Sequence, residues 1–193
     1  PERMIALMKA WRLPESAPLV LLPGRLTRWK GQGVLIDAIA RLNRPELHAV
    51  ILGSGNARYR RELEAAVERT GAAGNFRFIE DSPDMAVAYM LADVVVSAST
   101  APEGFGRVVV EAQAMGRPVI ATAHGGALET VRPGETGLLV PPGDAGAMAE
   151  AIAATLDLDA GTRLALARHQ IAHVREHFSS ALMTRRTLDV YEE

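Results

Sequence analysis

The chain has 193 residues, of which 48% are hydrophobic and 23% charged, so it can bury a sizeable core and is not of the disordered class. Its 21 Lys and Arg residues nearly balance its 23 Asp and Glu residues, which argues against a dedicated nucleic-acid-binding protein. It contains no Cys, which excludes a disulfide framework, a Cys-based zinc site and a thiol nucleophile.

Short apolar runs alternate with longer helical patterns along most of the chain. The runs are mostly apolar, as is typical of strands buried on both faces, and they cover 19–22, 48–52, 76–79, 93–97, 118–122 and 137–140. The helical patterns cover 33–42, 59–70, 82–91, 104–115 and 144–156, with Asp144 as the expected N-cap of the last one. This order predicts an α/β fold of the Rossmann-like kind, a mostly parallel sheet with helices on both faces.

Both ends of the chain lie outside this alternation. Residues 1–11 are weakly helical in pattern, and two more helices are predicted at 161–177 and 179–191. Because the chain starts with Pro1 and not Met, we interpret it as a single domain, residues 1–193, taken from a longer protein. Residues 1–11 and about 178–193 are then candidates to pack against an absent domain. No apolar run has the length of a membrane span, and no signal peptide opens the chain.

Ligands of open parallel sheets bind beyond the carboxyl ends of the strands, so the loops that follow strands are the candidate sites. The first such loop carries Arg25, Arg28 and Lys30 between Gly24 and Gly31. Arg25 and Lys30 can converge on one anion, and the two glycines allow a tight turn and a close ligand approach. Taken alone, however, the loop is more typical of an ordinary charged turn.

The second loop, Gly53-Ser54-Gly55, resembles part of a dinucleotide-binding turn. Arg58 stands where the third glycine of a G-x-G-x-x-G fingerprint belongs, so the pattern is incomplete. A tight strand-to-helix turn and a contact with a nucleoside explain this loop equally well.

The third loop, Glu103-Gly104-Phe105-Gly106, leads into the predicted helix that carries Glu111. Free amides at a helix N-terminus bind anions without any side chain. Glu111 is expected about two turns into an otherwise apolar helix, where a carboxylate needs partners such as the hydroxyls of a sugar or a ribose. The structural alternative is that Glu111 pairs with an Arg or caps a neighbouring helix.

Several short motifs follow one another in a specific order, the strongest being Glu103 and Glu111 in an E-x7-E arrangement. The others are Gly24-Arg25-Leu26 with Lys30-Gly31, Gly53-Ser54-Gly55, Ala92-Asp93-Val94, the segment 115–121, Gly125-Gly126 with Glu129, and the segment 136–140. With this set, residues 13–156 resemble the C-terminal, donor-nucleotide half of GT-B glycosyltransferases of the retaining family 4, the glycosyl transferases group 1. Three positions depart from the family pattern, at Ser99-Thr100, Glu80-Asp81 and Leu128, and they leave the preferences for base and sugar open.

The resemblance implies a role for each candidate residue. Arg25 and Lys30 match the pair that holds the donor diphosphate, Glu103 the residue that contacts the transferred sugar, and Glu111 the residue that holds the ribose. The amides of Gly104, Phe105 and Gly106 match the loop around sugar and phosphate, Gly24 belongs to the diphosphate loop, and the base is expected near Gly53 and Ser54. Arg25, Lys30 and Glu103 are thus the expected catalytic groups. A nucleophilic Glu103 is the weaker alternative, since E-x7-E residues resemble binding groups more than an acid/base pair.

The resemblance also implies a reaction and its partners. The donor is a nucleoside diphosphate sugar, transferred with retention of configuration, and the cations take the place of a metal ion, so no cofactor is expected. The acceptor-binding N-terminal domain is expected to be absent from this chain, which alone should turn over little or no donor. The resemblance favours a cytoplasmic protein, associated with a membrane only through the absent half.

Three alternatives stay open at this point. The chain is compatible with a catalytically silent module that binds a nucleotide sugar, and with a nucleotide-sugar epimerase of the GT-B type. An NAD-dependent enzyme is disfavoured because the glycine fingerprint is incomplete. Separately, His169, His173 and His177 recur every four residues, a spacing that permits metal binding but is more typical of a solvated helix face. His124, which precedes Gly125, is a minor candidate for a ligand contact.

Overall fold

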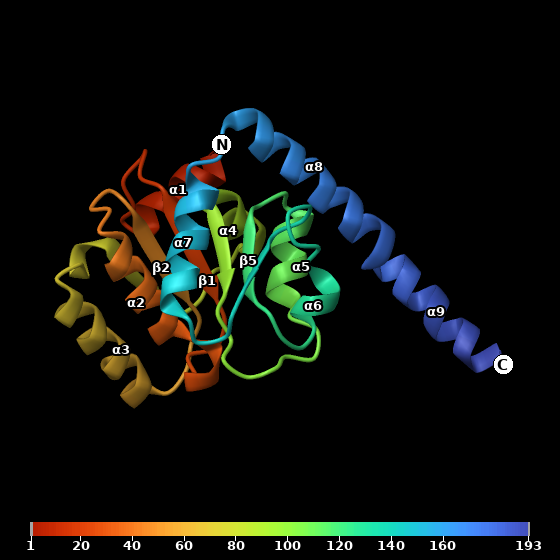
Figure 1. Ribbon diagram of the computed structural model, residues 1–193, viewed down its shortest axis with the longest axis horizontal. Helices are drawn as coiled ribbons and strands as arrows, with labels where there is room; N and C mark the ends of the chain where they lie inside the picture. The colour runs from red at the N-terminus through yellow and green to blue at the C-terminus, as the bar shows by residue number, and fades with distance from the viewer. Residues whose placement is uncertain (1, 193) are drawn as a thin grey trace.

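The computed structural model describes residues 2–192, which form one twisted sheet with helices on both faces and a long helical arm (Figure 1). The strands are β1 (Leu19–Pro23), β2 (His48–Leu52), β3 (Phe76–Ile79), β4 (Val94–Ser97), β5 (Val119–Thr122) and β6 (Leu138–Val140). The helices are α1 (Glu2–Ala10), α2 (Gln32–Leu42), α3 (Ala57–Thr70), α4 (Met85–Leu91), α5 (Arg107–Ala114), α6 (Ala127–Thr130), α7 (Ala145–Leu156), α8 (Ala160–His177) and α9 (Ser180–Glu192), with short 3-10 turns at Arg28–Lys30 and Ala73–Asn75.

The sheet confirms the predicted Rossmann-like class. Its strand order is β3-β2-β1-β4-β5-β6, and every neighbouring pair is parallel. The chain builds outward from β1 to β3 and then returns to place β4 beside β1. The direction of building therefore reverses between β1 and β4, and a crevice opens at the carboxyl ends of these two strands.

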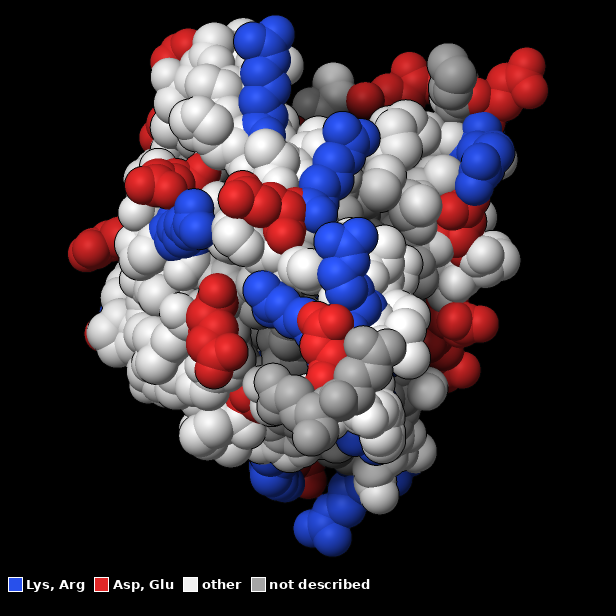
Figure 2. All heavy atoms as spheres, turned by 90° about the vertical axis from the view of Figure 1, so that its right-hand side faces the viewer, with Lys and Arg blue, Asp and Glu red and all other residues white. Residues whose placement is uncertain are grey.

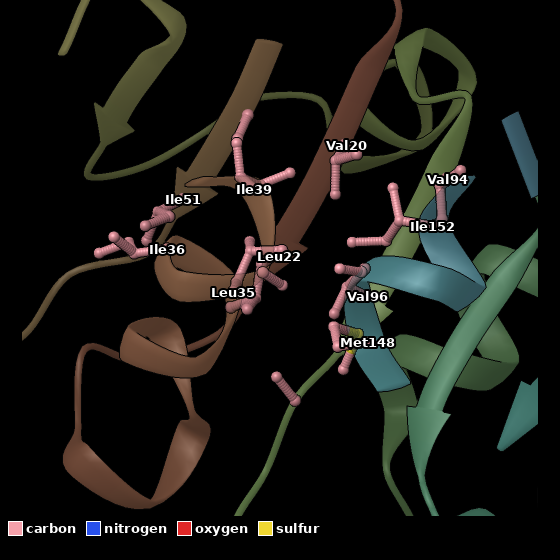
Figure 3. Packing of buried hydrophobic residues seen from close by; sticks show 14 of the residues in the cluster. Val20, Leu22, Leu35, Ile36, Ile39, Ile51, Val94, Val96, Met148 and Ile152 are labelled. Carbon is pink, nitrogen blue, oxygen red and sulfur yellow. The ribbon is translucent and has the colours of Figure 1, made fainter. Parts of the chain in front are cut away.

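The two faces of the sheet carry separate apolar cores because successive side chains of a strand point to opposite sides. Val20 and Leu22 of β1 pack with Val96 of β4 against α2 and α7, a layer that includes the fully buried Leu35 and Met148 (Figure 3). On the opposite face Leu19 and Leu21 pack beneath α1, α4 and α5. Coverage on both sides explains why the runs of the central strands β1, β2, β4 and β5 are mostly apolar.

The ends of the chain behave differently from one another. Helix α1 packs on α4 and buries Leu7 and Trp11 in the core of this domain. Helix α8 packs on α5 and continues into α9, which runs away from the sheet (Figure 1). Figure 2 faces this projecting end, where basic and acidic side chains are interspersed and no single sign of charge prevails. Within residues 2–192, no helix combines the length and the apolar composition needed to cross a membrane.

Three details differ from the sequence predictions. Helix α4 begins at Met85 and not at residue 82, because Asp84 caps it and accepts a hydrogen bond from the Val87 amide at 3.2 Å. Helix α5 begins at Arg107 and not at Gly104, because Gly106 takes the left-handed conformation (φ 71°) at its N-cap position. Glu111 consequently lies about one turn into the helix, not two. The short helix α6 was not predicted, since its four residues are too few to show a periodic pattern. Asp144 caps α7 as predicted, accepting a hydrogen bond from the Ala147 amide at 2.9 Å.

Candidate functional site

A cavity of about 510 Å³ lies at the reversal point of the sheet, between the loops that follow β1 and β4. These two loops lie next to each other at the lower edge of the sheet in Figure 1. The lining residues come from both loops and from the start of α5: Gly24, Arg25, Trp29, Lys30, Pro102, Glu103, Gly104, Phe105, Gly106, Arg107, Val108 and Glu111. The fold thus brings together eight of the ten residues singled out from the sequence.

The loop after β1 is fixed in place by its backbone. Gly31 has φ 70°, and a Cβ atom there would lie 1.8 Å from the carbonyl oxygen of Ala98, in the loop after β4. The Trp29 carbonyl accepts a hydrogen bond from the Thr100 amide at 2.7 Å, and the fully buried Gln32 donates to the Arg25 carbonyl at 2.9 Å. The two loops therefore touch through their main chains, which is possible only where a side chain is missing.

Lys30 and Glu103 form an ion pair across the two loops. Lys30 Nζ lies 2.7 Å from Glu103 Oε1, and the two side chains are only 15% and 18% exposed. The Ser99 hydroxyl donates to the same carboxylate oxygen, and Lys30 Nζ also lies 4.6 Å from the centroid of the Trp29 ring. Without a ligand, the cation and the carboxylate of the site neutralise each other.

Arg25 is the contrasting cation. Its side chain is exposed and makes no ion pair or side-chain hydrogen bond within residues 2–192. Arg107, at the first position of α5, is likewise an exposed cation of the cavity wall. The cavity therefore offers an anion at least one charge that no part of the described chain neutralises.

The segment from Glu103 to Gly106 rests on the loop after β5. The Gly126 amide donates to the Glu103 carbonyl at 2.8 Å. A Cβ atom at Gly125 would lie 2.5 Å from the Glu103 carbonyl oxygen, and one at Gly126 would lie 2.6 Å from that of Gly104. The Gly-Gly pair thus allows two backbones to approach closely, and it holds the segment that carries Glu103.

The main chain of the same segment can bind an anion. In the part of the chain that the structure describes, nothing accepts a hydrogen bond from the amides of Gly104, Phe105 and Gly106. These amides stand at the N-terminus of α5, where the partial positive charge of the helix adds to their effect.

Glu111 is exposed, contrary to the prediction that an apolar helix would surround it. Its helix turns this position toward the cavity, and a single partner holds it: the Tyr89 hydroxyl of α4 donates to Glu111 Oε2 at 2.7 Å. Neither an Arg nor a helix cap takes up this carboxylate in the described chain. Tyr89 itself is 2% exposed, and burial first, then the hydrogen bond to Glu111, raise its pKa.

Gly53 and Ser54 are the two predicted residues that do not line the cavity. Their loop supports the loop after β1 from behind: a Cβ atom at Gly53 would lie 2.2 Å from the Gly24 carbonyl oxygen, and the Leu26 amide donates to the Ser54 carbonyl at 2.9 Å. Close contact between two backbones therefore accounts for the glycines of this turn. The exposed Ser54 stays beside the cavity without forming its wall.

The four histidines noted in the sequence do not line the cavity. His124 Nε2 lies 2.7 Å from the Ser99 carbonyl oxygen, behind the loop and outside the cavity wall. His169 is exposed whereas His173 is buried against Phe178, so the predicted ladder does not share one environment. Among residues 2–192, no three His, Asp or Glu side chains gather closely enough to hold a metal ion.

Sequence reasoning missed some contributors and had partial signals for others. Ser99 lies four residues before Glu103 and Trp29 directly before Lys30, so both were within reach of a local search. Tyr89 comes from a different helix, and nothing in the sequence around it indicates a contact with Glu111. Only the packing of α4 beside α5 under one face of the sheet reveals that contact.

The site can be compared with known proteins at this point. The sequence model of the family described as "Glycosyl transferases group 1" matches residues 4–173. The D-inositol 3-phosphate glycosyltransferase of Corynebacterium urealyticum is 37% identical over 179 residues, which are 88% of this chain and 42% of that protein. The chain therefore spans less than half the length of this curated relative.

Solved structures agree with the sequence comparison. A glycosyltransferase from Rickettsia africae superposes with a TM-score of 0.94 at 29% identity, over 100% of this chain and 52% of that one. Anabaena Alr3699/HepE, solved in complex with UDP-glucose, gives a TM-score of 0.92 at 30% identity, over 100% of this chain and 53% of that one. The fold is that of the C-terminal half of a GT-B glycosyltransferase.

Proposed function

The chain belongs to the glycosyl transferases group 1, and on that premise we propose that its cavity binds a nucleoside diphosphate sugar. One observation carries the proposal: Arg25, Lys30, three free amides and two carboxylates surround a single cavity at the sheet's reversal point. This combination suits a ligand that is anionic in its centre and rich in hydroxyl groups at both ends. The Anabaena relative that was solved with UDP-glucose supports the same class of ligand.

In this proposal the cations and amides bind the diphosphate. Cleavage of the anomeric bond leaves negative charge on the departing nucleoside diphosphate, and Arg25, Lys30 and the α5 amides stabilise that charge. They supply the positive charge that a metal ion supplies in other transferases, so we propose that the reaction needs no metal. Glu103 accepts hydrogen bonds from the transferred sugar, and Glu111 accepts them from the ribose.

Lys30 changes partner when the donor binds. The diphosphate takes over Lys30 from Glu103, and the sugar hydroxyls give Glu103 new donors, so each half of the ion pair receives a replacement. We propose that the leaving phosphate also helps to deprotonate the acceptor on the same face of the sugar, which gives retention of configuration.

The acceptor is expected to bind elsewhere in a longer protein. The chain spans about half the length of the relatives it matches, and exposed residues such as Arg25 and Phe105 line the cavity. We propose that a second domain closes the cavity and holds the acceptor, and that the isolated chain binds the donor but transfers little or no sugar.

Calorimetric titration of the chain with UDP, GDP and ADP, each in EDTA, tests the proposal. One diphosphate should bind, and its sugar conjugate should bind with a different affinity and enthalpy, because Glu103 then gains hydroxyl partners. Lack of binding by all three, or binding only when a divalent metal is added, would contradict it. Sugar transfer by the chain alone at a rate of the order of 1 s⁻¹, near the low end for enzymes, would contradict the need for a second domain.

A further inference from the structure

Tyr89 belongs to the core by its burial and to the site by its hydroxyl. Its side chain is 2% exposed and belongs to the apolar cluster below one face of the sheet, which also includes Val109 of α5. Its hydroxyl reaches out of this core and ends 2.7 Å from Glu111 Oε2 on the neighbouring helix. A buried hydroxyl without a partner costs free energy, so the packing of the ring and the position of Glu111 depend on each other.

Glu111 needs such a partner to be held in one place. The side chain is exposed, and Tyr89 is the one hydrogen-bond donor that it finds within residues 2–192. A free glutamate on a helix surface samples many rotamers, and fixing it at the moment of ligand binding costs entropy. The hydrogen bond from the Tyr89 hydroxyl already restricts the Glu111 side chain in the unliganded protein, so ligand binding loses less of this entropy.

The hydrogen bond also divides the carboxylate into two ends. Oε2 faces Tyr89, whereas Oε1 makes no hydrogen bond in the described chain and belongs to the side chain that lines the cavity. Burial and the hydrogen bond to Glu111 raise the pKa of Tyr89, which favours the protonated hydroxyl that donates in this contact. The carboxylate is thus held as an acceptor with its free oxygen available to a ligand.

We propose that Tyr89 is a positioning residue for the nucleotide, which fixes the Glu111 carboxylate so that it receives the ribose hydroxyls. The inference rests on the proposed function and adds to it a residue of the core that touches no ligand. It assigns recognition of the ribose to a pair from two helices, α4 and α5, in which only Glu111 meets the nucleotide.

The test compares Tyr89→Phe with the unchanged chain by calorimetry. The probe is UDP, or whichever of GDP and ADP binds more tightly, together with its 2′,3′-dideoxy form. Phenylalanine keeps the buried ring and removes only the hydroxyl. We expect the ribonucleotide to bind about tenfold more weakly to the variant, the effect of losing one hydrogen bond to a charged group. The dideoxy probe should bind to both proteins equally, within about twofold.

Two further variants separate this role from a general loss of structure. Tyr59→Phe is the matched control, because Tyr59 is a half-buried tyrosine on α3 that lies outside the cavity wall. The Tyr59→Phe variant should bind the probe with the affinity of the unchanged chain. In a Glu111→Gln background, Tyr89→Phe should have little further effect, since both changes act through the same carboxylate.

The outcomes distinguish the two proposals. If Glu111→Gln weakens ribonucleotide binding and Tyr89→Phe does not, the positioning role is wrong and the proposed function stands. Equal weakening of the ribonucleotide and the dideoxy probe by Tyr89→Phe also overturns the positioning role, because the effect is then not transmitted to the ribose. If the unchanged chain binds none of the diphosphates, the proposed function is wrong, and the role of Tyr89 is wrong with it.

Discussion

The loops of the cavity and the arm formed by α9 are opposite kinds of structure within one chain. The loops after β1, β4 and β5 are joined by main-chain hydrogen bonds, by glycines at close backbone contacts and by the Lys30–Glu103 pair. The arm runs away from the sheet, and every described side chain from Met183 to Tyr191 is exposed (Figure 1). The difference indicates that the cavity is built by contacts within the described chain, whereas the arm side chains from Met183 to Tyr191 stay exposed in it.

The largest effect is expected from a substitution that disrupts the contact between the loops after β1 and β4. Gly31→Ala should lower the free energy of unfolding by at least about 3 kcal/mol, because the new Cβ clashes with the Ala98 carbonyl at a left-handed backbone position. Urea denaturation measures this. Gly33→Ala is the control: it lies in the first turn of α2, meets nothing within 4 Å, and should leave stability equal or raise it by up to about 1 kcal/mol. Equal effects of the two changes would mean that the loop contact is not rigid.

The next effect separates the two cations. Arg25→Met and Lys30→Met should each weaken binding of UDP, or of the preferred diphosphate, by about 1.5–3 kcal/mol in calorimetry. Only Lys30→Met should also destabilise the fold, by about 1 kcal/mol, because it removes a partner of the half-buried Glu103 carboxylate, whereas Arg25 has no such partner. Unchanged affinity in both variants would show that the loop after β1 is only a charged turn.

A smaller effect concerns the junction between body and arm. His173 lies at the end of α8, and burial first, then the charges of Arg132 and His177, lower its pKa from the usual 6.5. The unfolded chain therefore takes up this proton first, so stability is complete above about pH 6.5 and decreases as the pH falls below it. The free energy of unfolding should decrease less between pH 7 and pH 5 in His173→Leu than in the unchanged chain. His169→Leu, an exposed histidine on the same helix, should behave like the unchanged chain.

The smallest effect is expected from the arm. Deletion of residues 180–193 should change the free energy of unfolding by less than about 1 kcal/mol and leave nucleotide affinity unchanged, because the removed side chains from Met183 to Tyr191 are exposed. Thermal unfolding and calorimetry check both. A loss of nucleotide binding on deletion would show that the arm supports the cavity and would remove the contrast between the two regions.

The sequence was sufficient for the layout of the sheet and insufficient for some local detail. Short, mostly apolar runs such as 48–52, which turn residues bound, favour buried strands, and all six were predicted within one residue at either end. The start of α5 was misplaced because Gly106 takes a left-handed conformation, which glycine permits but a periodic pattern does not signal. The environment of Glu111 was misjudged because its immediate neighbours Val110 and Ala112 face the core, whereas Glu111 turns toward the cavity.

The site shows the same difference: a local pattern is sufficient to find some of its residues, whereas the contacts between them follow only from the packing. Arg25, Lys30 and Glu103 could be found because they occupy loops that directly follow strands, where sheet topology alone places ligands. The pairing of Lys30 with Glu103 and the contact of Tyr89 with Glu111 join segments 73 and 22 residues apart. Pairings at such separations depend on packing that a local pattern does not encode. The Gly53-Ser54 turn left two readings open, and the close backbone contacts it makes explain its glycines.

The Lys30–Glu103 pair affects which anions can compete for Lys30 in the unliganded cavity. An inorganic phosphate that took Lys30 from Glu103 would bring almost no hydroxyl donors, so Glu103 would keep only the Ser99 hydroxyl in a half-buried place. A ligand that carries an anion and hydroxyls at the right spacing replaces both partners at once. On the proposed function, the ion pair therefore favours a nucleotide sugar over a bare small anion at Lys30, and a small anion is left with Arg25 and the amides at the N-terminus of α5.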